Sequence, residues 1–239
     1  MTAVILAAGI SSRLRPLTDN VPKCLLPVGG IPLLERTLVS LQKAGLRNAL
    51  IVTGYLREQI EGFVARLGIE LEVTFVNNPV FDRTNNNYSL WLAGEKLSGE
   101  EMLLLDADIL FDRRIIPTLL SSQGENALVI RRSSALGKEE MKVECDEQGY
   151  VKRISKEIDP SLATGESLGI ERFSSLTTAV LFQTLGRRKD RYEYYEDSFQ
   201  EIIDQGAKIR TVDIGQLPCV EIDTTEDLAA AERLAQSID

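Results

Sequence analysis

The segment that most constrains this chain is an apolar run near its start that ends abruptly at a glycine. Val4 to Ala8 are apolar, Gly9 ends the run, and a small polar loop with Arg13 follows. A short, uninterrupted apolar run of this kind is typical of a strand buried on both faces of a parallel sheet. The loop after such a strand lies at the carboxyl edge, where open α/β sheets bind ligands. The run therefore predicts a ligand-binding loop directly after the first strand.

The residues of that loop favour an anionic ligand. Small side chains at Ala7, Ala8 and Gly9 allow a flat base or a phosphate to approach the backbone. Backbone N–H groups of the loop and the guanidinium of Arg13 can contact phosphate oxygens. Ten residues further on, Lys23 follows a proline and supplies a second cation on a stiffened segment. Two cations and a small-residue loop are together suited to a nucleoside triphosphate.

Residues 4–28 resemble the signature of the nucleotidyltransferases that activate phosphorylated sugars and alcohols, which is Gly-x-Gly-Ser/Thr-Arg followed by a Pro-Lys pair. The resemblance implies that the loop wraps a triphosphate, that Arg13 helps to expel pyrophosphate and that Lys23 contacts phosphate at the reacting centre. It also implies a set of nucleotide-binding residues in this segment: Leu6, Ala7, Ala8, Gly9, Ser11, Ser12, Arg13 and Lys23. Ser11 stands where the family often has a second glycine, so we expect the loop to avoid φ values reserved for glycine. A generic strand-to-helix turn with surface cations is the alternative.

The composition excludes several classes of function. A chain of 239 residues with 44% hydrophobic and 26% charged residues fits one soluble α/β domain. The net charge of −9 argues against a nucleic-acid surface, and no apolar run reaches the roughly 20 residues of a membrane span. The three cysteines lack metal-ligand spacing, and we expect them to be reduced, mostly buried thiols in a cytoplasm. Because histidine is absent, imidazole catalysis and histidine-ligated zinc are impossible.

Strand and helix patterns alternate through the first half of the chain, which favours an α/β fold with a mainly parallel, Rossmann-like sheet flanked by helices. The family resemblance implies the same fold, that of the nucleotide-diphospho-sugar transferases. We predict strands at 2–7, 49–53, 71–76, 102–106 and 126–131, and helices at 32–45, 56–67, 86–96 and 112–121. We expect a single domain over residues 1–239, in which residues 1–131 mainly bind the nucleotide and residues 132–239 mainly bind the acceptor.

Beyond residue 141 the pattern changes to a hairpin followed by helices. Two alternating segments, 141–145 and 150–155, flank the turn signal Asp-Glu-Gln-Gly at 146–149. For the rest of the chain we predict a loop at 156–172, helices at 174–188 and 195–205, a strand at 208–213 and a final helix from about 225.

Two pairs of carboxylates are candidates for a metal site. Asp106 and Asp108 stand at the end of a predicted buried strand, and Glu221 and Asp223 precede an N-capping sequence for the last helix. Carboxylate oxygens together with substrate phosphates are the usual ligands of Mg²⁺. The resemblance implies that Asp108 and Asp223 jointly hold the metal and that Asp106 orients the loop or the nucleotide ribose. A solvated strand end is the alternative for Asp108, and a helix cap is the alternative for Asp223.

The reaction expected from this site needs no general base. A phosphate or phosphonate oxygen of the acceptor is already anionic at pH 7 and would attack the α-phosphorus in line, so that pyrophosphate leaves. Catalysis would then depend on positioning two anions and neutralising their repulsion. Lys23, Arg13 and Mg²⁺ would supply that charge. Lys142 is a candidate second cation facing the acceptor, with a merely solvent-facing lysine as the alternative.

The identity of the acceptor is indicated by weaker signals. Within the family, residues 78–79 with 84–91, 140–143 and 194–197 are most similar to the choline-phosphate cytidylyltransferases of bacteria. This similarity implies CTP and choline phosphate as substrates, with inositol phosphate, aminoethylphosphonate or a sugar 1-phosphate as alternative acceptors. A metal-dependent glycosyltransferase and a non-catalytic nucleotide-binding regulator are less favoured classes. The first has no need of the triphosphate signature, and the second would be expected to lose Lys23 or Asp108. The oligomeric state is not indicated.

A quaternary ammonium group would need aromatic rings and carboxylates around it. Residues 192–195 contain three tyrosines beside two acids, and a hydrogen-bonded surface loop is the alternative for them. Trp91 falls on an apolar helical face, and we therefore predict that it belongs to the core. The candidate acceptor-binding residues are Asn86, Lys142, Glu171, Tyr194, Tyr195, Glu196 and Glu221.

Overall fold

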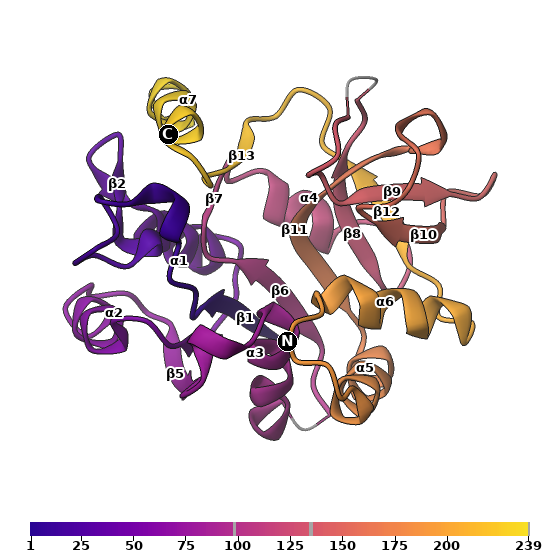
Figure 1. The fold of residues 1–239 in the computed structure, drawn as a ribbon, viewed down its shortest axis with the longest axis horizontal. Helices are drawn as coiled ribbons and strands as arrows, with labels where there is room; N and C mark the ends of the chain where they lie inside the picture. Colours follow the sequence, from indigo (N-terminus) through magenta and orange to yellow (C-terminus); the bar gives the residue numbers. More distant parts are fainter. Residues whose placement is uncertain (98, 134–135, 239) are drawn as a thin grey trace.

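The computed structural model describes residues 1–97, 99–133 and 136–238, which are built around one nine-stranded sheet (Figure 1). Its strands are β1 (Thr2–Ala7), β4 (Asn48–Thr53), β5 (Glu72–Asn77), β6 (Met102–Asp106), β8 (Ala127–Arg131), β9 (Lys142–Cys145), β10 (Val151–Ser155), β11 (Gly165–Phe173) and β12 (Arg210–Asp213). They run in the order β10-β9-β11-β6-β1-β4-β5, while β8 pairs with β11 and β12. β5, β4, β1 and β6 are mutually parallel, whereas β11 is antiparallel to its neighbours. The predicted fold class is confirmed.

Helices cover both faces of this sheet. Packed against one face are α1 (Leu33–Lys43), α2 (Arg57–Val64) and α4 (Ile115–Leu120). Against the other face are α3 (Asn86–Ala93), α5 (Ser175–Arg187) and α6 (Tyr195–Asp204). β1 supplies both cores because its side chains alternate: Ile5 belongs to the first core and Val4 to the second, and both are fully buried. The prediction of a strand buried on both faces is thereby confirmed.

The ends of several helices agree with the signals in the sequence. Asn85 caps α3, since its side chain accepts a hydrogen bond from the backbone N–H of Asn86. Thr224 caps the last helix, α7 (Thr225–Ala235), in a reciprocal capping box with Asp227. Gly45 follows the end of α1 with φ +88°, a conformation that favours glycine.

Two short strand pairs connect the beginning and the end of the chain. β2 (Pro27–Val28) pairs with β3 (Ile31–Pro32), and β7 (Ile109–Phe111) pairs with β13 (Cys219–Glu221). α7, drawn in yellow in Figure 1, lies beside β2 in the N-terminal part of the fold. A third buried cluster joins these segments and includes Leu14, Leu110 and Ile222. The β7–β13 pair therefore brings the residues after Glu221 next to the end of β6.

Two predictions about the fold are wrong. The predicted loop at 156–172 contains most of β11, the nine-residue strand at the centre of the second half. Its polar residues, Glu166 and Glu171 among them, interrupt any apolar alternation and so conceal the strand. Trp91 does not belong to the core: 39% of its surface is exposed, because α3 turns Leu90 toward the sheet instead. The Trp91 ring packs beside that of Tyr88, with the ring centroids 5.3 Å apart.

The described residues also test the expectations about the cysteines and about membrane-spanning segments. Cys24, Cys145 and Cys219 are all free thiols, of which Cys24 and Cys219 are buried. Among the helices of the described part of the chain, none has the length and apolar character needed to cross a bilayer.

Candidate active site

The loop after β1 has a left-handed turn at a residue that is not glycine. Ser11 has φ 54° and ψ 51°, so the expectation that the loop avoids such values is wrong. The left-handed region is small but accessible to serine. The conformation is held by two hydrogen bonds to the Ser11 carbonyl, one from the Thr18 hydroxyl at 2.9 Å and one from the Leu14 backbone at 3.1 Å. Ser11 thus adopts a left-handed conformation that glycine adopts more readily.

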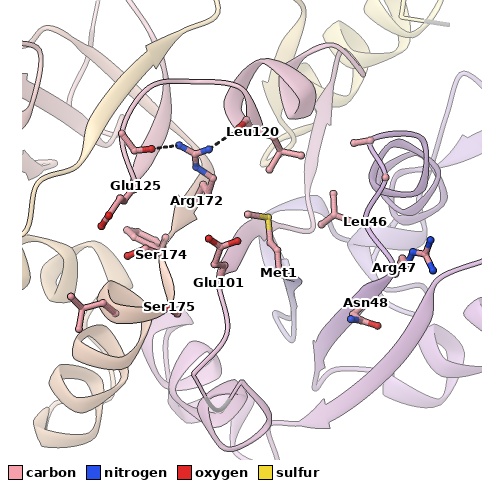
Figure 2. Close-up of a pocket in the computed structure, with 15 residues that line it drawn as sticks. Met1, Leu46, Arg47, Asn48, Glu101, Leu120, Glu125, Arg172, Ser174 and Ser175 are labelled. Carbon is pink, nitrogen blue, oxygen red and sulfur yellow. Dashed lines mark hydrogen bonds between the residues drawn. The ribbon is translucent and has the colours of Figure 1, made fainter.

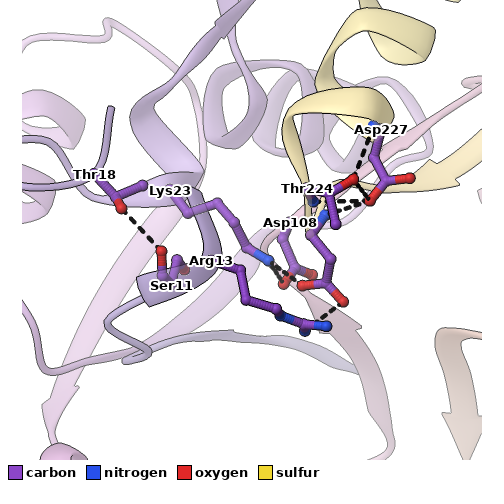
Figure 3. Close-up of polar contacts among 8 residues, drawn as sticks. Ser11, Arg13, Thr18, Lys23, Asp108, Thr224 and Asp227 are labelled. Carbon is purple, nitrogen blue, oxygen red and sulfur yellow. Dashed lines mark hydrogen bonds and ion pairs between the residues drawn. The ribbon is translucent and has the colours of Figure 1, made fainter. Parts of the chain in front are cut away.

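Lys23 joins two acidic residues from distant parts of the chain (Figure 3). Its ammonium lies 2.6 Å from Oδ2 of Asp108 and 2.9 Å from Oδ1 of Asp223. Arg13 approaches the other oxygen of Asp223 at 2.7 Å. Burial alone would lower the pKa of Lys23, but the two carboxylates outweigh it and raise the pKa above its ordinary value. Both predicted catalytic cations, Arg13 and Lys23, therefore form ion pairs with the predicted metal ligands.

Three carboxylates in this site are close enough to share one ion. Asp108, Glu221 and Asp223 each place an oxygen within 4.8 Å of the others. Oδ1 of Asp108 is buried and has no hydrogen-bond partner in the described part of the chain. Mg²⁺ prefers hard oxygen ligands such as carboxylates, so these three residues fit this ion. Glu221, which we predicted to bind the acceptor, thus lies beside the two predicted metal ligands, and burial together with the charge of Asp108 raises its pKa to about 8.

The alternative interpretation of Asp223 as a helix cap does not describe its side chain. Thr224 is the N-cap of α7, and its hydroxyl accepts the hydrogen bond from the backbone of Asp227. The backbone N–H of Asp223 donates to the carboxylate of Asp227 at 3.1 Å, which leaves its own carboxylate directed at Lys23 and Arg13. A hydrogen bond from Ile222 N to the carbonyl of Asp108, 3.0 Å long, fixes the two strands side by side.

Asp106 forms a hydrogen bond with the second half of the chain. Its Oδ2 accepts a hydrogen bond of 2.8 Å from the hydroxyl of Tyr195 at the start of α6. Gly169 on β11 lies against the same oxygen: a Cβ there would come within 2.6 Å of it, and the backbone φ of +64° also favours glycine. Burial, followed by the charges of Asp108 and Glu196, raises the pKa of Asp106 well above its usual range. Asp106 is thus joined to predicted acceptor-binding residues.

Four of the predicted acceptor-binding residues gather around this contact. Tyr195 is fully buried, and its backbone N–H donates to Oδ1 of Asn86 at 3.0 Å. Glu171 is fully buried, and neither of its carboxylate oxygens has a hydrogen-bond partner among the described residues. Glu196 is 8% exposed, and its Oε2 also has no hydrogen-bond partner among the described residues. Burial, with the neighbouring charges of Asp106 and Glu196, raises the pKa of Glu171 well above its usual range.

The structure places the other two predicted acceptor residues differently. Lys142 is 1% exposed, so the solvent-facing alternative is wrong; its ammonium donates at 3.0 Å to the backbone carbonyls of Gly137 and Glu140. Tyr194 is 40% exposed, and the ammonium of Lys156 lies 4.9 Å from its ring centroid. Adjacent tyrosines therefore have opposite orientations, one toward the core and one toward the surface.

Cavities of different size lie at the two edges of the sheet. One of about 50 Å³ is lined by the loop after β1, Lys23 and Asp108, and one of about 370 Å³ by Arg13, Glu221 and Asp223. A larger cavity, about 900 Å³, lies at the opposite edge, where β1, β4 and β6 begin (Figure 2). Met1, Glu101 and Arg172 line it, and Arg172 donates a 2.7 Å hydrogen bond to the carbonyl of Leu120. This larger cavity contains none of the predicted site residues.

The buried carboxyl of Glu196 predicts a pH dependence of stability. Burial raises its pKa to about 8 from an ordinary value of 4.5. Between these values the folded chain keeps a proton that the unfolded chain has released, so this group's contribution to stability falls as the pH rises. We expect Glu196→Gln to show a smaller loss of unfolding free energy between about pH 5 and about pH 8 than the parent.

Urea denaturation at several pH values measures this effect. Glu157, an exposed glutamate, offers the control Glu157→Gln, which should keep the parent's pH dependence. If the Glu196→Gln and parent curves have the same slope across this range, Glu196 is ionised in the folded chain and the inference is wrong.

This geometry defines an α/β protein with a cationic loop and an acidic cluster at the carboxyl edge of its sheet. A family model described as "MobA-like NTP transferase domain" matches residues 3–168, which is more than half of the chain. The chain belongs to this family of NTP transferases.

Curated relatives with significant sequence similarity include a choline-phosphate cytidylyltransferase and a bifunctional enzyme. The chain is 30% identical over 247 residues, 97% of its length and 51% of the relative's, to a bifunctional IPC transferase and DIPP synthase of Aquifex aeolicus. It is 40% identical over 108 residues, 45% of its length and 44% of the relative's, to a choline-phosphate cytidylyltransferase of Streptococcus pneumoniae. The matched regions span about half the length of these relatives.

Solved structures show the same fold over nearly the whole chain. The CTP:phosphocholine cytidylyltransferase of Streptococcus pneumoniae matches with a TM-score of 0.77 at 23% identity, covering 98% of both chains. An inositol-1-phosphate CTP transferase of T. maritima matches with a TM-score of 0.82 at 24% identity, covering 99% of this chain and 95% of the other. The family resemblance stated from residues 4–28 is confirmed.

Proposed function

We propose that this chain is a cytidylyltransferase that transfers CMP from CTP to a phosphorylated small alcohol, choline phosphate, and releases pyrophosphate. The observation that carries the proposal is the meeting of Lys23 with Asp108 and Asp223 beside the small-residue loop. Such an arrangement combines phosphate-binding cations with carboxylates for a divalent ion. The relatives named as choline-phosphate cytidylyltransferases support the choice of nucleotide and acceptor class.

In this mechanism the loop residues Leu6 to Arg13 bind the triphosphate through backbone N–H groups, and Arg13 neutralises the departing pyrophosphate. Lys23 reduces the repulsion between the acceptor phosphate and the α-phosphate, which are both anions. Asp108 and Asp223, with Glu221 beside them, would hold Mg²⁺, and the ion would polarise the phosphoryl oxygens. The attacking oxygen is already ionised, so no side chain has to remove a proton from it.

The acceptor would lie between the metal candidates and the group formed by Asp106, Glu171, Tyr195 and Glu196. A cationic headgroup bound beside Glu171 and Glu196 would favour the ionised form of these buried carboxyls, which would then compensate its charge. Residues 1–131 would then mainly bind the nucleotide, and residues 132–239 would mainly bind the acceptor. Asn86 and Asp106, both from the first half, form hydrogen bonds with Tyr195 of the second half.

The choline assignment predicts the effect of one exposed ring. A cation–π contact contributes about 0.5–2 kcal/mol, so Tyr194→Ala should raise the KM for choline phosphate by roughly three- to thirtyfold and leave the KM for CTP unchanged. Tyr192, 68% exposed on the same segment, offers the matched control Tyr192→Ala, which should change neither constant. Tyr195→Ala is a poor probe because it opens a cavity in the core. An unchanged KM for choline phosphate in Tyr194→Ala would remove this ring from the acceptor site.

A panel that crosses four nucleoside triphosphates with choline phosphate, inositol phosphate, aminoethylphosphonate and glucose 1-phosphate tests the proposal. Pyrophosphate release is expected to be fastest with CTP and choline phosphate. Turnover of a neutral polyol phosphate but not of choline phosphate would contradict the choline assignment and leave the nucleotidyltransferase assignment standing.

A further inference from the structure

We propose that Lys23 acts as an internal counter-ion that excludes a divalent metal from Asp108 and Asp223 until nucleotide phosphates draw it away. Metal and nucleotide would then bind cooperatively, and the metal alone would bind weakly. The inference rests on the proposed function only in assigning a nucleotide and a divalent ion to this site.

The contacts of Lys23 are those that a bound cation would make. Its ammonium is held by one oxygen of Asp108 and one of Asp223, at 2.6 and 2.9 Å. These are two of the three carboxylates whose oxygens lie within 4.8 Å of one another. Arg13 takes the second oxygen of Asp223 at 2.7 Å. A divalent ion that needs these oxygens must therefore replace both the lysine and the arginine.

Displacing the lysine without offering it a new partner is unfavourable. Only 10% of the Lys23 side chain is exposed, so an ammonium that leaves the carboxylates is poorly hydrated where it stands. A buried charge that loses its partner is strongly destabilising. Metal alone would have to overcome this cost, as well as the repulsion between two cations at short range.

Nucleotide phosphates remove that obstacle. Lys23, Gly9, Ser11 and Asp108 line one small cavity, so the lysine stands between the nucleotide-binding loop and the carboxylates. The flexible four-carbon stem of lysine allows its ammonium to move from one side to the other. Once phosphates pair with Lys23 and Arg13, the carboxylates are free for the metal. Since such coupling is reciprocal, the metal must raise the affinity for nucleotide by the same factor.

Binding of Mn²⁺ alone, with no nucleotide present, tests the inference. The free Mn²⁺ is measured by electron paramagnetic resonance in titrations of the parent and of four variants. Lys23→Gln removes the charge and keeps an N–H donor toward the carboxylates, and Lys23→Met removes both. We expect each to bind Mn²⁺ at least about tenfold more tightly than the parent.

Two variants act as controls in the same titration. Lys23→Arg keeps the charge and should stay within about twofold of the parent. Lys152→Met removes a charge from an exposed ion pair with Glu144 and should also stay within about twofold, which excludes an effect of net charge alone. Circular dichroism establishes which variants are folded, and Lys23→Gln carries the test if Lys23→Met is not.

Equal or weaker binding by Lys23→Gln, including undetectable binding by both it and the parent, would overturn the inference. Tighter binding by Lys152→Met to the same extent would overturn it as well. Neither result depends on turnover, so the inference can fail while the parent still transfers CMP. Conversely, an increase in Mn²⁺ affinity in a protein that releases no pyrophosphate from CTP would count against the proposed function alone.

Discussion

Replacing Lys23 by alanine is expected to lower the rate of nucleotidyl transfer by about 10²–10³-fold and to leave the fold intact. The lysine is the buried cation of the site, positioned by Asp108 and Asp223, and it would stabilise charge that develops at the reacting phosphates. Loss of one such preorganised group typically costs about 3–4 kcal/mol in the transition state. Lys23 is attached to a short turn at the edge of the sheet, so the two main cores do not depend on its side chain.

Steady-state release of pyrophosphate measures this effect, with circular dichroism to establish folding. Lys152→Ala, which removes an exposed lysine, is the control and should retain the parent's rate. A folded Lys23→Ala variant with a rate within threefold of the parent would remove Lys23 from the mechanism.

Asp108→Asn and Asp223→Asn should each abolish productive use of Mg²⁺, and the double variant should be little worse than either single one. The two carboxylates share Lys23 and lie in one acidic cluster, so they are expected to hold one ion as a unit. The effects of residues that act as a unit do not add. The rate as a function of Mg²⁺ concentration is the measurement for all three variants.

Thermal unfolding of the same variants separates a metal ligand from a structural residue. Asp227 forms the capping box of α7 with Thr224, so Asp227→Asn is the matched control that should affect stability more than metal dependence. Lower thermal stability of Asp223→Asn with an unchanged metal dependence would mean that Asp223 has a structural role only.

The nucleotide side of the site could be predicted from sequence because its signals are local. An apolar strand, a small-residue loop and two cations lie within residues 4–28, and the chain between them is too short to separate them. The same holds for α3 and α7, whose caps at Asn85 and Thr224 are read from adjacent residues. Local chemistry of this kind determines local geometry.

The acceptor side could not be predicted to the same extent because it is assembled by long-range pairing. β11 was missed because its polar residues, among them the fully buried Glu171, interrupt the apolar alternation by which a strand is recognised. The hydrogen bond between Tyr195 and Asp106 joins residues 89 positions apart. Glu221 could have been assigned to the metal cluster from its position two residues before Asp223, but its proximity to Asp108 depends on the pairing of β7 with β13.

The orientation of single side chains was likewise decided by packing. Tyr194 and Tyr195 are adjacent tyrosines that no local sequence pattern distinguishes. Tyr194 is nevertheless 40% exposed and Tyr195 fully buried, because only Tyr195 packs into the core at the start of α6. Lys142 is buried among backbone carbonyls of residues 137–140, a partner set that sequence patterns do not indicate.

The central claim, that this chain transfers a nucleoside monophosphate to a phosphorylated alcohol, is tested most directly by identifying both products of one reaction. The parent protein is incubated with CTP, choline phosphate and Mg²⁺, and the mixture is followed by ³¹P nuclear magnetic resonance. We expect pyrophosphate and CDP-choline to appear in equal amounts, and Asp108→Asn to form neither. Hydrolysis of CTP without a diphosphate-linked product, or no consumption of any nucleoside triphosphate with any phosphorylated acceptor, would contradict the claim.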